Sequence, residues 1–149
     1  MTDTMTEQQL VEKIKKVTDF CVEHRSKWVM QGMADWHKAN RYIEYCMMMG
    51  KCAVLWKKDE VQGVLFYWSD FAEHIEMKYA ENRPQFEWAE PISGDCVFAG
   101  DLIGDKESAG NIIGTLLEQF PHLLITPIYT YRKGKLKKLN IRLLQRFAL

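Results

Sequence analysis

The chain has 149 residues, of which 47% are apolar, and its 20 basic and 20 acidic residues give a formal net charge of zero. This size and composition predict one globular domain over residues 1–149, and the balanced charge argues against a generally basic nucleic-acid binder or an acidic solubilising protein. No apolar run reaches the roughly 18 residues that a membrane span requires. The four cysteines form no Cys-x-x-Cys pair, so we expect reduced core thiols in a cytoplasmic protein, with no metal site.

The charge is unevenly distributed along the chain. Seven basic residues fall within the last 18 positions, and no acidic residue follows Glu118. Such a tail has two interpretations. It is a patch that meets an anion (a phosphate, a nucleic acid or an acidic face of the same protein), or it is a solvated edge beside an acidic body.

Two amphipathic helices are predicted first. In residues 7–28 the apolar side chains recur at three- and four-residue steps, as in Leu10, Ile14 and Val17. A second helix is predicted over residues 36–49, with Asp35 as its N-cap and Gly50 just beyond its end.

A β-hairpin is predicted next, with strands at residues 51–56 and 63–68 joined by the polar segment KKDEVQ. Both strands are too apolar for a sheet with one solvated face, so we expect helices on both faces. The aromatic side chains around this hairpin suit a core, or the lining of a ligand pocket, and a homodimer would follow if the hairpin exposed them. Residues 69–91 fit a loop, a short helix or an edge strand.

The stretch from Asp95 to Arg132 predicts strand, polar turn, helix and strand. An apolar strand over 95–104 leads into a turn over 105–108, and Ser108 is the expected N-cap of a helix that ends before Pro121. A further strand follows over 123–131. The basic tail fits a helix or a strand, with Lys133 and Gly134 as a hairpin tip.

Together these elements predict an α+β fold with a mixed, mainly antiparallel central sheet flanked by helices, and with one β-helix-β crossover. The start of the crossover helix is a candidate anion site. Amides at a helix N-terminus lack helical partners and carry partial positive charge, so they can hold a phosphate. The cradle residues would be Ser108, Ala109, Gly110 and Asn111, although an ordinary helix cap explains the same residues.

The string VFAGDLIGDKESAGNIIGTLLEQF and the order of elements resemble the GNAT superfamily of acyl-CoA N-acyltransferases. The resemblance in the order of elements covers residues 7–132, and the resemblance in sequence pattern covers about 25 residues. It equates residues 97–103 with the family's central strand and 108–120 with its cofactor-side helix. The chain is short at its C-terminal end, as are the toxin-activating lysine acyltransferases that share this fold. The resemblance implies acyl-CoA as cofactor, bound through Ser108–Asn111, and an amine as acceptor, either a small molecule or a protein.

The resemblance also implies roles for side chains near the crossover. Tyr129 or Tyr131 would protonate the departing thiolate, while Asp101 or a glutamate after the hairpin would accept the proton of the amine. Sheet residues that pack a core edge are the favoured alternative for both tyrosines, and a structural pair with an arginine or lysine is the more common explanation of a residue like Asp101. The rival hypothesis is a non-catalytic protein on the same scaffold that binds a protein or a nucleic acid through its basic tail.

Overall fold

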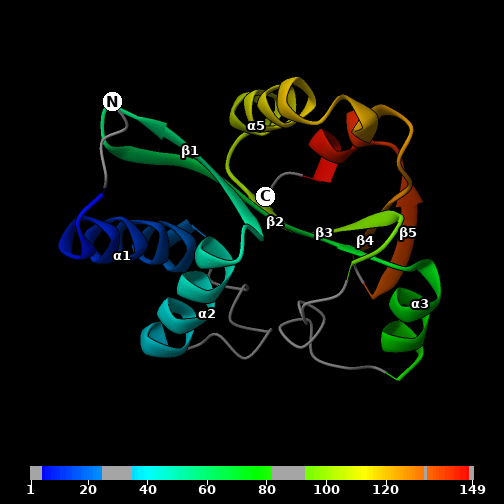
Figure 1. The fold of residues 1–149 in the computed structure, drawn as a ribbon, viewed down its shortest axis with the longest axis horizontal. Helices are drawn as coiled ribbons and strands as arrows, with labels where there is room; N and C mark the ends of the chain where they lie inside the picture. Colours follow the sequence, from blue (N-terminus) through cyan, green and yellow to red (C-terminus); the bar gives the residue numbers. More distant parts are fainter. Residues whose placement is uncertain (1–4, 25–34, 82–92, 133, 148–149) are drawn as a thin grey trace.

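The computed structural model describes residues 5–24, 35–81, 93–132 and 134–147. Helices, short 3-10 helices (η) and strands follow one another along the chain as shown in Figure 1. Their bounds are α1 Glu7–His24, α2 Trp36–Met48, β1 Cys52–Lys57, β2 Glu60–Asp70, α3 Ala72–Ala80, β3 Cys96–Ile103, α5 Lys106–Gln119, η2 Pro121–Leu124, β4 Ile128–Arg132, β5 Lys135–Leu139 and η3 Ile141–Phe147.

The strands form one mixed sheet in the order β1-β2-β3-β4-β5. Strands β3 and β4 are parallel, and every other neighbouring pair is antiparallel. The single parallel pair brackets α5, so this helix is the crossover that the sequence predicts. The prediction of an α+β fold with a mixed, mainly antiparallel sheet is confirmed.

Helices cover both faces of the sheet, as the apolar strands predict. In Figure 1, α1 and α2 lie below the sheet, while α5 and η3 lie above it. Each face has its own apolar core because successive side chains of a strand point to opposite sides. The core on the α1/α2 face includes Ile14, Val17, Ile43, Phe66 and Phe98. The core on the α5 face includes Leu65, Leu102, Ile112, Leu116 and Leu144.

Asp35 caps α2 as predicted: its carboxylate accepts a hydrogen bond from the His37 amide at 2.8 Å. The hairpin differs from its prediction, because only Lys58 and Asp59 connect β1 to β2. Both residues have positive φ, 51° and 64°, which gives the type I′ geometry whose twist matches that of paired strands. The polar residues after the turn therefore belong to β2.

The second half of the chain also departs from its predicted bounds. Strand β4 begins at Ile128 because the apolar residues before it form the short helix η2, which Pro121 starts. Gly134, with φ of 76°, forms the hairpin tip as expected. The tail is a strand followed by a 3-10 helix, so each interpretation was correct for part of it. Of the ambiguous residues 69–91, α3 accounts for 72–80, and 82–91 lie outside the described residues. Within the described residues, no helix combines the length and apolar character needed to cross a membrane.

Candidate functional site

The two parallel strands separate toward the C-terminal end of β3. Pairing joins Val97–Ala99 to Ile128–Thr130, yet β3 continues to Ile103. Pairing with β4 is therefore seen only in the first half of β3, and Asp101 lies further along the same strand.

A cleft of about 750 Å³ opens where β3 ends and α5 begins. Its walls come from the last turns of α1, the first residues of β2 and the β3–α5 turn. The lining residues are Phe20, His24, Glu60, Val61, Gln62, Gly104, Asp105 and Lys106. The cleft therefore joins an imidazole, an ammonium group, two carboxylates and the start of a helix.

The orientation of His24 follows from its partners. Its Nδ1 lies 3.0 Å from the carbonyl oxygen of Phe20, and its ring stacks on the Phe20 ring with centroids 4.3 Å apart. A carbonyl oxygen can only accept, so Nδ1 is the donor, and in the neutral imidazole the lone pair is then on Nε2. His24 thus presents a proton acceptor at the cleft.

The turn into α5 depends on Gly104 and Asp105. Gly104 has φ of 140°, and a Cβ at this position would lie 3.1 Å from the carbonyl oxygen of Gln62. Asp105 is the N-cap, and its carboxylate accepts the Ser108 amide at 2.7 Å. This hydrogen bond lowers the pKa of Asp105. Lys106 is then the first helical residue and faces the cleft.

The expected phosphate cradle is not available at Ser108–Asn111. The Ser108 amide is bound by Asp105, and the Ala109 amide donates to the Asp105 carbonyl at 3.0 Å. The Gln145 side chain packs over Gly110, where a Cβ would lie 3.0 Å from Nε2 of Gln145. Asn111 lies one position further into the helix. The predicted N-cap is wrong: Asp105, not Ser108, caps the helix, so the cap lies three residues earlier than expected.

Asp101 lies on the α1/α2 side of the sheet, near Tyr42 of α2. Burial, then Cys46, and to a lesser extent the negative charge of Asp101, raise the pKa of Tyr42. Asp101 is half-buried and has interaction partners. It is therefore placed in the separated stretch of β3 but does not belong to the lining of the cleft beside His24.

Tyr129 and Tyr131 share the α1/α2 face of the sheet, as their alternation predicts. Burial, and then the negative charge of Glu76, raise the pKa of Tyr129, so its phenol stays protonated at neutral pH. The Tyr131 ring lies 5.7 Å from that of Tyr79. Neither tyrosine lines the cleft, and Ser108 and Ala109 lie on the other face. The structure does not bring the predicted site residues together.

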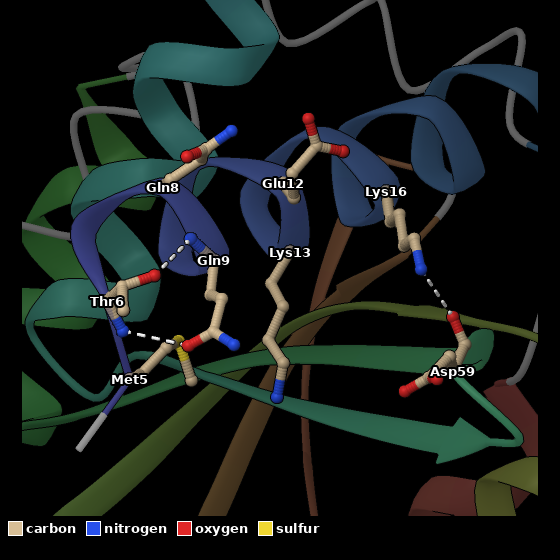
Figure 2. A pocket seen from close by; sticks show the side chains of 8 residues that line it. All are labelled: Met5, Thr6, Gln8, Gln9, Glu12, Lys13, Lys16 and Asp59. Atoms are coloured by element: carbon tan, nitrogen blue, oxygen red, sulfur yellow. Dashed lines mark hydrogen bonds between the residues drawn. The ribbon is translucent and has the colours of Figure 1, made fainter.

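Contacts along α1 fix the position of His24 at its end. A capping box starts the helix. The Gln9 side chain accepts a hydrogen bond from the Thr6 amide at 2.9 Å, and the Thr6 hydroxyl accepts one from the Gln9 amide at 3.1 Å. Lys13 lies over the Trp56 ring, 5.4 Å from its centroid, and Lys16 donates to the Asp59 carbonyl at 3.1 Å. Figure 2 shows both lysines reaching from α1 toward the hairpin, around an open polar hollow of about 690 Å³. The hairpin therefore anchors the helix that carries His24.

Sequence reasoning missed His24, Gly104 and Lys106 as site residues. One signal was present: Phe20 and His24 are four residues apart, a spacing that stacks side chains on one helix face. Comparison of the chain with protein-family models, with curated proteins and with solved structures finds no match. In the described residues, no group of three histidine, cysteine, aspartate or glutamate side chains is placed to hold a metal ion.

Proposed function

We propose that this chain is an acyl-CoA-dependent N-acyltransferase with a GNAT-like fold, acting on an amine acceptor. The observation that carries the proposal is the cleft that His24 and Lys106, the first residue of α5, both line. A proton acceptor beside a helix N-terminus and an ammonium group suits a reaction that joins an amine to an anionic acyl donor.

The topology supports the same proposal. Two helices precede an antiparallel pair, and a parallel pair around α5 follows it. The separation of β3 from β4 after Ala99 leaves strand edges facing one another beside this helix. Asp101 lies just beyond the last residue of β3 that pairs with β4.

The chemistry assigns each group a step. The amine nitrogen attacks the thioester carbonyl, Nε2 of His24 takes the amine proton, and the carbon–sulfur bond breaks to release a thiolate. A rival arrangement places the substrates on the α1/α2 side of the sheet, outside the cleft of His24. There Asp101 would accept the amine proton, and Tyr129, whose pKa is raised, would protonate the thiolate. Lys106 and the exposed start of α5 would hold the donor's diphosphate in place of Ser108–Asn111.

Donor binding is the first test. Isothermal titration with acetyl-CoA should give a saturable heat, and the Lys106→Glu substitution should weaken the affinity about tenfold, which is ~1.4 kcal/mol. The exposed Lys38→Glu substitution on α2 is the matched control and should leave the affinity unchanged. A flat trace at millimolar acetyl-CoA would refute the transferase proposal.

The base is tested by turnover. Release of free coenzyme A is followed with a panel of amines such as spermidine and Nα-acetyl-lysine. The His24→Gln substitution should lower kcat by about 10²–10⁴-fold, with the affinity for acetyl-CoA retained. If Asp101→Asn abolishes turnover while His24→Gln does not, the carboxylate is the base and the role given to His24 is wrong.

A second candidate function rests on the basic C-terminal segment, because its cations lie together on edge strand β5 and on η3. The exposed members are Lys135, Lys137, Lys138, Arg142 and Arg146. Such a strip would hold a nucleic acid through its phosphates, and binding would then fall steeply with salt. Retention of a single-stranded oligonucleotide at 50 mM but not 300 mM salt would support it, whereas no retention at low salt would exclude it.

We also infer a reducing, cytoplasmic location. Burial raises the pKa of Cys46 and Cys52 to about 12, so both thiols stay protonated and poorly reactive at neutral pH. The native protein should therefore label slowly with iodoacetamide at these positions, and rapid labelling of either would contradict the buried environment.

A further inference from the structure

The two edges of the sheet differ in charge. Edge strand β5 has the sequence KLKKL, and edge lysines of this kind discourage pairing with another strand. Edge strand β1 has the sequence CAVLWK, with no charged residue before Lys57. Within the described residues, nothing pairs with the outer edge of β1.

The hydrogen-bond register shows which backbone groups of β1 point outward. The Tyr67 amide donates to the Lys51 carbonyl at 2.9 Å, and Ala53 and Leu55 face Leu65 and Gly63 in the same register. Bonded pairs alternate along an antiparallel ladder, so Ala53 and Leu55 bond to β2. The amide and carbonyl groups of Cys52 and Val54 then point away from the sheet. The regular register ends at a bulge after Leu55.

A groove of about 290 Å³ lies along this outward edge. Four consecutive residues, Cys52–Leu55, line it together with Tyr67 and with Ile112, Thr115, Leu116 and Gln119 of α5. Side chains of a strand alternate between faces. A groove lined by four successive residues therefore follows the backbone edge itself, and none of its lining residues is charged.

We propose that the outer edge of β1 is a docking site for an extended peptide segment of a partner protein. The segment would add a sixth strand by bonding to the outward groups of Cys52 and Val54. Main-chain bonds provide affinity in this mode of recognition, and a pocket beside the strand selects side chains. The neutral groove selects an apolar side chain, and the exposed Lys57 and Lys58 at the end of β1 favour an acidic residue next to it.

A second copy of this chain fits the same edge less well. Two-fold antiparallel pairing centred on the outward residue Val54 would place Lys57 of one copy opposite Lys51 of the other. Burial, and to a lesser degree the neighbouring Lys78, already lower the pKa of Lys51. Like charges placed opposite each other destabilise strand pairing. Charge therefore favours a partner with an acidic end.

The test is selection of random heptapeptides displayed on phage against the full chain, followed by fluorescence polarisation of the selected synthetic peptide. We expect the selected peptides to contain β-branched and apolar residues, with an acidic residue directly before or after them. The exposed Thr115→Trp change should fill the groove and weaken binding at least tenfold, while Glu118→Trp, exposed on the same helix but outside the groove, should not.

A second variant tests the backbone bonds. Val54→Pro removes an outward amide that β2 does not use, and proline is tolerated at such edge positions. Circular dichroism must show that the variant is folded, and its peptide affinity should fall at least tenfold. Equal binding to the wild type, Thr115→Trp and Val54→Pro would overturn the proposal. So would failure to select any peptide, or a dimer in sedimentation that Thr115→Trp dissociates. None of these readouts depends on transferase activity.

Discussion

At two strand-to-helix junctions of this fold, an aspartate carboxylate accepts a main-chain amide, in different surroundings. Asp70 ends β2 before α3 and accepts the Phe71 amide at 2.7 Å, while Asp105 follows β3 and accepts the Ser108 amide at 2.7 Å. The Asp70 side chain is only 1% exposed and pairs with Lys78 at 3.2 Å. Asp105 is exposed at the mouth of the cleft.

The difference shows how burial separates a structural carboxylate from an available one. Asp70 is enclosed: His74 Nδ1 lies 3.4 Å from its carboxylate, and the Cys96 thiol donates to its carbonyl at 3.0 Å. A buried charge must keep its partners, since desolvation is costly without them. The carboxylate of Asp105 accepts the Ser108 amide and is otherwise exposed to solvent, so it needs no buried counter-ion.

Breaking the enclosed junction should have the largest effect. Lys78→Ala leaves Asp70 buried without its counter-ion and should lower the free energy of unfolding by about 3–5 kcal/mol. Urea denaturation measures the loss. The matched change at the exposed Lys57 should stay within about 0.5 kcal/mol, and similar losses at both positions would show that the Asp70–Lys78 pair is not structurally important.

Removing both charges sharpens the comparison. A Lys78→Met, Asp70→Asn double variant should be destabilised by less than half as much as Lys78→Ala, because no buried ion is left unpaired. The asparagine oxygen can still accept the Phe71 amide. An additive loss in the double-mutant cycle would mean that the two charges do not interact.

At the exposed Asp105 junction, the larger loss of stability should come from a change in backbone conformation. Gly104→Ala forces a residue with a Cβ into φ of 140°, which should cost about 1–3 kcal/mol. Gly114→Ala, within α5, meets no atom within 4 Å and should stabilise by about 0.5–1 kcal/mol. Thermal unfolding should shift in opposite directions for the two variants, and the same sign in both would contradict this account.

The smallest effect is expected at Asp105 itself. Its folded-state pKa is lowered by the Ser108 amide, so the carboxylate stabilises the fold above its unfolded pKa of about 3.9 and loses that effect as the pH falls through the lower folded value. Asp105→Asn should therefore be slightly less stable than the wild type at pH 6, with the gap closing in acid. A gap that widens in acid would reverse the assigned sign.

Local sequence signals determined much of the fold. The periodic spacing of apolar residues predicted α1, α2 and the strands. Asp35 was recognised as an N-cap because a capping side chain bonds an amide only two or three residues along the chain. The start of α5 was misplaced because two polar residues, Asp105 and Ser108, can both cap a helix. Asp105 is the N-cap in the structure, because its carboxylate accepts the Ser108 amide. That local competition moved the N-cap of α5 from the expected Ser108 to Asp105.

The sequence by itself determined the α+β class, the crossover helix and the basic tail, because these depend on periodicity and composition. Only the tertiary structure decided that His24 faces the β3–α5 turn across 80 residues of chain, that β4 leaves β3 after Ala99, and that Gln145 covers Gly110. Such contacts join residues distant in sequence. Their formation depends on how whole helices pack against the sheet, and this packing leaves no local pattern in the chain.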